Sequence, residues 1–86
     1  MARASKYESA RDDLLRMIDA AARAHGRPPS VRELADHVEV GVATLHSYLQ
    51  KMGEEDLVTW QSKHHRSLRL TPQGSQRVSS LDAQSA

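Results

Sequence analysis

The 86-residue sequence contains no cysteine and no phenylalanine, and its aromatic residues are one tryptophan and two tyrosines. Without cysteine, neither a disulfide framework nor a thiolate metal site can brace the fold. No apolar run approaches the length that crosses a bilayer, and the first residues lack the apolar segment of a secretory signal. We therefore expect one small cytoplasmic domain without membrane association, held together by a single hydrophobic core.

Motifs of catalysis and of metal binding are also missing. The sequence has no Gly-rich phosphate loop, no nucleophile elbow and no paired-carboxylate motif beyond the charges of solvated helices. Five histidines are present, but they match no ligand spacing with cysteine or carboxylate. The few aromatic residues are not interleaved with basic ones, as a single-stranded nucleic acid would require. We expect neither an enzyme nor a metal or cofactor site.

The net charge is only +1, so the chain as a whole is not a polycation. The charge is distributed unevenly along the chain. Residues 1–56 hold eight Lys/Arg and ten Asp/Glu, a net charge of −2, whereas residues 57–86 hold four Lys/Arg and one Asp, a net charge of +3. Positive charge therefore gathers in the carboxyl-terminal part of the chain.

Three helices are predicted in the first part of the chain. Apolar residues recur at intervals of three and four over residues 6–24, which indicates a first helix that Gly26 and the two prolines after it terminate. Ser30 to Glu33 form an S-x-x-E capping box, so a second helix should begin at Val31 and end near residue 38. After a short turn, residues 42–52 should form a third helix, and this spacing is typical of a helix-turn-helix.

The third predicted helix has two different faces. Its core face carries Leu45, Leu49 and Met52, with Tyr48 beside them. The opposite face carries Ala43, His46, Ser47 and Gln50. This second face is small and uncharged over its first two turns, as expected of a surface that approaches base edges closely.

A β-hairpin should follow the helices. Residues 57–61 and 67–71 have strand character, and the turn between them carries a basic tip of Lys63, His64, His65 and Arg66. Trp60 is expected to pack in the core or the hairpin. Pro72 should end the ladder and begin a short last helix through Val78 and Leu81. We expect a domain over residues 6–81, with flexible termini at residues 1–5 and 82–86.

The predicted architecture is mainly α with a small β-hairpin: a winged helix-turn-helix with a three-helix core, a wing and a short C-terminal helix. Residues 25–35 at the entry to the second helix, and the hairpin from Leu57-Val58 to Arg66–Leu70, resemble the DNA-binding domain of the LexA repressor family. The resemblance covers roughly residues 8–71. In the LexA repressor family a self-cleaving protease domain follows the DNA-binding domain, and we do not expect its activity in this chain.

Three further details bear on this resemblance. Helix-turn-helix sequences usually place glycine where Glu39 stands, although the turn can use Gly41 differently. The third helix resembles a generic repressor recognition helix more than that of the LexA family, so the family's base preference is not carried over. Residues 70–74, Leu-Thr-Pro-Gln-Gly, resemble the exit from the wing in MarR-like regulators.

The resemblance implies a sequence-specific regulator that binds double-stranded DNA, with a repressor as the expected type, found on the nucleoid when bound. Base-facing positions would be Ala43, His46, Ser47 and Gln50. Positions on the DNA backbone or in the wing would be Ser30, Arg32, Thr44, Lys51, Lys63, His64, His65, Arg66 and Arg69. Because the third helix supplies only Lys51 as a cation, we expect binding as a homodimer at a two-fold site.

A second hypothesis remains open. The same fold serves as a protein-protein interaction module, for instance in a replication, partition or phage regulatory complex. Taken alone, a basic hairpin tip can also be an ordinary solvated loop. The arginines of the first helix, Arg11, Arg16 and Arg23, are interpreted as its solvated face rather than as DNA contacts.

Overall fold

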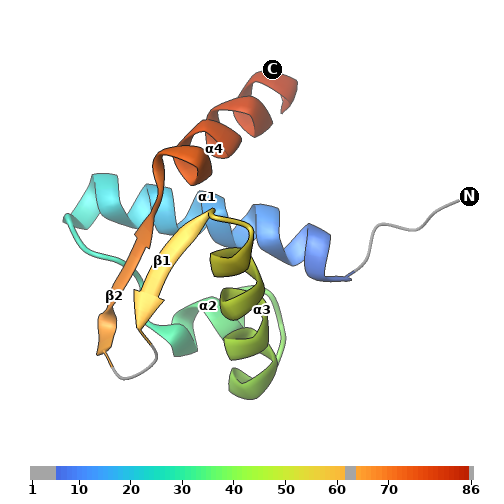
Figure 1. The fold of residues 1–86 in the computed structure, drawn as a ribbon, viewed down its shortest axis with the longest axis vertical. Helices are drawn as coiled ribbons and strands as arrows, with labels where there is room; N and C mark the ends of the chain where they lie inside the picture. Colours follow the sequence, from blue (N-terminus) through green and yellow to red (C-terminus); the bar gives the residue numbers. More distant parts are fainter. Residues whose placement is uncertain (1–5, 62–63, 86) are drawn as a thin grey trace, which may run out of the picture.

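The computed structural model describes residues 6–61 and 64–85, with the backbone alone for residues 61, 64–67, 84 and 85. The elements formed by these residues are α1 (Lys6–His25), α2 (Val31–His37), α3 (Val42–Glu54), β1 (Val58–Gln61), β2 (His64–Leu70) and α4 (Pro72–Ser85). The two strands pair antiparallel. This order and the hairpin confirm the predicted mainly helical fold of the winged helix-turn-helix type (Figure 1).

The apolar stripes predicted for the first three helices meet in one core. Leu14 and Leu15 of α1 and Leu34 of α2 are fully buried. The core face of α3 is likewise fully buried: Leu45, Leu49 and Met52. The hairpin adds Val58 and Leu68, and α4 adds Val78. A chain of this size therefore uses every element to cover its core.

The capping box forms as predicted at the start of α2. The Ser30 hydroxyl accepts from the backbone N–H of Glu33 at 3.0 Å, and the Ser30 N–H donates to the Glu33 carboxylate at 3.0 Å. The hydrogen bond from the Ser30 backbone lowers the pKa of Glu33, because it favours the ionised carboxylate. This cap fixes the start of a helix that is only seven residues long.

The turn between α2 and α3 takes the left-handed conformation at Glu39, the position where helix-turn-helix sequences usually place glycine, and not at Gly41. Glu39 has φ 58°, in the left-handed region. Gly41 has φ −72° and ψ 160° and is the N-cap of α3. A non-glycine residue in the left-handed region costs about 1 kcal/mol or more, so packing of α2 against α3 must offset this strain.

Three element boundaries differ by more than one residue from the sequence prediction. α3 continues past residue 52 and through Gly53 to Glu54, and the left-handed residue beyond it is Asp56, with φ 61°. β2 begins at His64 instead of Ser67. α4 continues beyond Leu81 to Ser85, so residues 82–85, expected to be flexible, are helical. The longer helix is anchored by Val78 and Leu81, which are 3% and 8% exposed.

Thr71 joins the hairpin to α4. Its hydroxyl accepts from the backbone N–H of Gly74 at 3.0 Å and donates to the carbonyl of Asp56. Its backbone N–H donates to the carbonyl of Leu57 at 3.0 Å. Thr71 therefore caps α4 and ties its start to the loop that follows α3, which gives the Leu-Thr-Pro-Gln-Gly segment a structural role.

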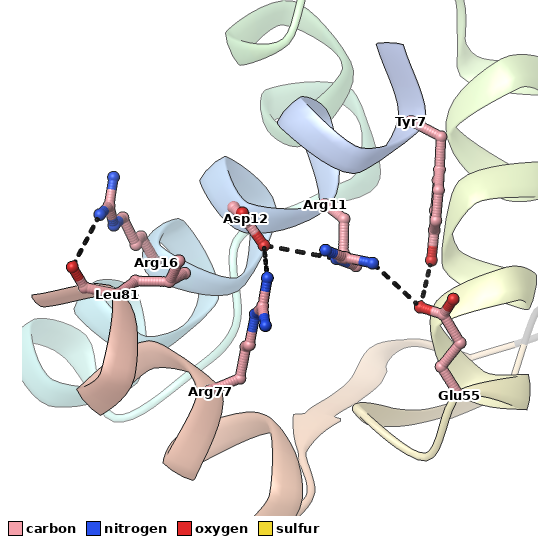
Figure 2. Close-up of polar contacts among 7 residues, drawn as sticks. All are labelled: Tyr7, Arg11, Asp12, Arg16, Glu55, Arg77 and Leu81. Atoms are coloured by element: carbon pink, nitrogen blue, oxygen red, sulfur yellow. Dashed lines mark hydrogen bonds and ion pairs between the residues drawn. The ribbon is translucent and has the colours of Figure 1, made fainter. Parts of the chain in front are cut away.

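Side chains of α1 link the C-terminal end of α3 to α4 (Figure 2). Tyr7 donates a 2.8 Å hydrogen bond to Glu55, and Arg11 lies 3.6 Å from the same carboxylate. The prediction of a solvated arginine face is correct for Arg23, which is exposed beside Asp19. It is wrong for Arg11, whose side chain is only 17% exposed. Arg16 also departs from it, because its guanidinium lies 3.5 Å from the carbonyl of Leu81.

Candidate nucleic-acid interface

The face of α3 opposite the core is exposed over most of its length. Ala43, Ser47 and Gln50, three of the four predicted base-facing residues, are exposed. Their neighbours along the helix, Leu45 and Leu49, are fully buried. The Ser47 hydroxyl donates to the carbonyl of Ala43 at 3.4 Å, a bond that a competing acceptor can replace. The geometry therefore leaves this face free for a partner.

The fourth predicted base-facing residue, His46, lies between α3 and the hairpin. Its ring is half-buried and meets the Trp60 ring edge-on, with centroids 5.3 Å apart and an interplanar angle of 82°. Trp60 lies where the register of the hairpin shifts, between Thr59 and Gln61. The sequence predicted packing for Trp60, but not this contact. His46 therefore also positions the hairpin against α3.

Sequence reasoning missed Val42, the first residue of α3. Its side chain is 45% exposed. It lines a shallow hollow together with Ser30, Val31, Arg32 and His46. The spacing offered a signal, because Val42 precedes His46 by one helical turn and the two residues must lie on one side of α3. The exposed face therefore extends to the first turn of the helix.

The residues predicted to contact the DNA backbone lie in two different places. Ser30 and Arg32 are exposed at the start of α2, and both line the hollow next to Val42. Thr44 is exposed on α3. Lys51 lies elsewhere, because its Nζ is 4.6 Å from the centroid of the Tyr7 ring on α1. This cation–π contact holds the Lys51 ammonium group beside α1 and away from the hollow.

The predicted wing residues lie mostly outside the described side chains. Lys63 is not among the described residues, and the side chains of His64, His65 and Arg66 are not described, although their backbone belongs to β2. Arg69 is exposed and pairs with Thr59 across the hairpin. It lines a second hollow with Ile18 and Asp19, so it lies beside α1.

The first turn of α3 and the ends of β1 and β2 at the hairpin tip lie at one end of the molecule (Figure 1). α4 lies at the opposite end, and α2 packs beside α3. Among the residues whose side chains the structure describes, no three His, Asp or Glu are grouped as metal ligands would be. No helix within residues 6–61 and 64–85 has the length and hydrophobicity that crossing a membrane requires.

Comparison with known proteins gives one relative of interest. The LexA repressor of Enterococcus faecalis (strain ATCC 700802 / V583) is 26% identical to this chain over 76 residues, which make up 87% of the chain and 36% of the repressor. The chain thus spans about a third of that relative's length. No family model matches the sequence. The similarity agrees with the resemblance seen at residues 8–71, and the relative is a repressor by name.

Proposed function

We propose that the chain is a sequence-specific double-stranded DNA-binding regulator of transcription, acting as a repressor. In this proposal α3 enters the major groove, and the hairpin lies on the flanking backbone or in the minor groove. The observation that carries it is the exposed, uncharged face of α3 beside the hairpin, with the core face of the same helix fully buried. Similarity to a LexA repressor over most of the chain supports it.

Each group of residues would have a distinct task. Gln50 can pair with N6 and N7 of adenine, and His46 can donate to guanine. The methyl group of Ala43 can contact a thymine methyl, and Ser47 can bond to either kind of base. Contacts to phosphate from Ser30 and Arg32 would fix the register of α3 without selecting a sequence. Small uncharged side chains favour this role because they allow close approach to base edges.

We propose that the bound form contains two copies of the chain. The described part of α3 contributes Lys51 as its cation, and Lys51 lies over the Tyr7 ring. Duplex binders that make six to ten phosphate contacts need more cations than one copy brings to this end of the molecule. Two copies on a palindromic site would double the number of phosphate contacts.

The direct test is selection of binding sites from random duplexes with the purified protein. We expect an enriched motif with two-fold symmetry. Changing His46 and Gln50 to alanine should alter the preferred sequence, because these residues are assigned to base edges. Changing Lys63 and Arg66 to alanine should weaken binding to every duplex and reduce its salt dependence. Arg23→Ala is the matched control, since Arg23 is an exposed cation on α1 paired with Asp19.

Three results would oppose the proposal. Enrichment of no motif would favour the protein-interaction module. Equal loss of binding to selected and random DNA in the His46 and Gln50 variants would remove their base-contacting role. If the Arg23 control weakened binding as much as the Lys63 and Arg66 variant, the hairpin would have no special part in binding.

A further inference from the structure

The hollow at the first turn of α3 has an exposed apolar side chain in its wall. Its volume is about 270 Å³, and Ser30, Val31, Arg32, Val42 and His46 line it. Val42 is the one large apolar side chain that is exposed in the described part of the chain, at 45%. A partner that places an apolar group in this hollow would remove the Val42 side chain from water, which is favourable.

The charges around the hollow restrict the partner's chemistry. Arg32 is the charged residue among those that line it. The nearby Glu33 carboxylate is oriented by the hydrogen bond that it accepts from the backbone N–H of Ser30, and it does not line the hollow. The hollow thus combines an apolar wall with a cation beside it. A thymine or a 5-methylcytosine in the major groove offers a 5-methyl group to the apolar wall, and the DNA backbone offers phosphate to the cation.

We propose that this hollow binds the 5-methyl group of a pyrimidine in the major groove, and that Val42 determines the preference for it. The proposal rests on the proposed function, because it requires α3 to lie in the major groove. α2 and α3 lie side by side at the end of the molecule away from α4 (Figure 1). Val42 and His46 of α3 line the hollow, so a duplex that meets the first turn of α3 also meets the hollow. Thymine and 5-methylcytosine both carry this methyl group.

The test uses the duplex enriched by the selection experiment, with single bases replaced. Burying one methyl group is worth about 0.8 kcal/mol, which is about fourfold in affinity. Replacing thymine by uracil at each position in turn should weaken binding about fourfold at the position opposite Val42. At that position, 5-methylcytosine should exceed cytosine by a similar factor. Whichever of thymine and 5-methylcytosine binds more tightly identifies the natural source of the methyl group.

Two variants assign the effect to Val42. Val42→Ser removes both methyl groups and should make the protein indifferent to thymine or uracil at that position. Val42→Ile keeps the apolar surface and should retain the preference. Thermal unfolding of each variant checks that the fold is intact, which we expect because Val42 is exposed in the first turn of α3.

The outcomes separate this inference from the proposed function. If no duplex is enriched, both proposals fall. If a motif is enriched but uracil replaces thymine everywhere without loss, DNA recognition stands and the methyl site is wrong. If Val42→Ser folds normally and still distinguishes thymine from uracil, another residue reads the methyl group.

Discussion

At the scale of single residues, two glycines near the loop after α3 meet opposite constraints. A Cβ placed on Gly74 would lie 2.1 Å from the carbonyl oxygen of Leu57, which is backbone and cannot move aside freely. A Cβ on Gly53 would have its nearest neighbour, the carbonyl oxygen of Val58, at 3.8 Å. Gly74 is therefore required by a close backbone approach, whereas Gly53 only adds flexibility to the last turn of α3.

We expect Gly74→Ala to lower the free energy of unfolding by about 1–3 kcal/mol, because α4 must shift away from Leu57. Gly53→Ala should raise it by about 0.5–1 kcal/mol, since alanine loses less conformational freedom than glycine in a helix. Urea denaturation of both variants measures the difference. An equally stable Gly74→Ala protein would show that α4 is not held against the Leu57 carbonyl.

Residue patterns predicted the site only in part. The exposed positions Ala43, Ser47 and Gln50 follow from helical periodicity, because it fixes which residues face away from the core. The contact between His46 and Trp60 joins elements distant in sequence, and no local pattern encodes such a contact. Glu39 shows the same limit. The preference of glycine for left-handed conformations did not predict a left-handed Glu39, because the packing of α2 against α3 decides which position of the turn takes that conformation.

At the scale of elements, Tyr7 fastens α1 to the end of α3. Its hydroxyl donates to Glu55, its ring lies edge-on to Tyr48 with centroids 5.4 Å apart, and Lys51 lies over its face. Burial raises the pKa of the Tyr7 hydroxyl, and the Glu55 carboxylate raises it further, because both disfavour the phenolate. The contact therefore depends on a neutral tyrosine.

This raised pKa gives a pH dependence of definite sign. Its stabilising contribution is fully present below pH 10, near the unfolded pKa of tyrosine, and declines as pH rises towards the folded pKa. We expect Tyr7→Phe to lower the free energy of unfolding by about 1 kcal/mol at neutral pH, through loss of the hydrogen bond. The same variant should lose less stability than the wild type between about pH 8 and about pH 11.

Urea denaturation at the two pH values measures both effects. Tyr48→Phe is the matched control, since it alters the neighbouring ring and leaves the Tyr7–Glu55 hydrogen bond in place. If both variants responded to pH in the same way, Tyr7 would not be the group responsible for the loss of stability in alkali.

The elements themselves were largely predictable, and their ends were not. The apolar stripes of α1, α2 and α3 and the Ser30 capping box define three helices locally. α4 extends beyond the prediction because its residues pack and bond against α1, with Arg77 3.5 Å from Asp12 and Arg16 beside Leu81 (Figure 2). Such stabilisation comes from tertiary contacts, so residues 82–85 carry little local sign of a helix.

At the scale of the whole molecule, two groups of acidic residues lie away from the first turn of α3. Glu54, Glu55 and Asp56 stand at the C-terminal end of α3, opposite the turn that begins at Val42. Asp12 is held by Arg11 and Arg77 between α1 and α4. These four carboxylates therefore do not face a polyanion that approaches the first turn of α3, whereas Glu33 and Glu39 stand close to that turn.

The proposed complex makes a quantitative prediction about salt. The cations assigned to phosphate in each copy, apart from Lys51 over the Tyr7 ring, are Arg32, Lys63, Arg66 and Arg69. Each neutralised phosphate contributes about −0.9 to the slope of log K against log salt concentration. We expect a slope of about −4 for one bound copy and about −7 for two copies. Titrations of the selected duplex at several salt concentrations, at a pH where histidine is neutral, measure this slope.

Stoichiometry and one variant complete the test. If two copies bind, Arg32→Ala should reduce the magnitude of the slope by about 2, one unit from each copy. Arg23→Ala, which changes an α1 cation already paired with Asp19, should leave the slope unchanged. A slope near −4 together with a complex of one protein per duplex would contradict the two-copy arrangement and leave α3 and the wing acting as a single unit. A slope near zero would remove phosphate contacts, and with them duplex DNA, as the partner of this surface.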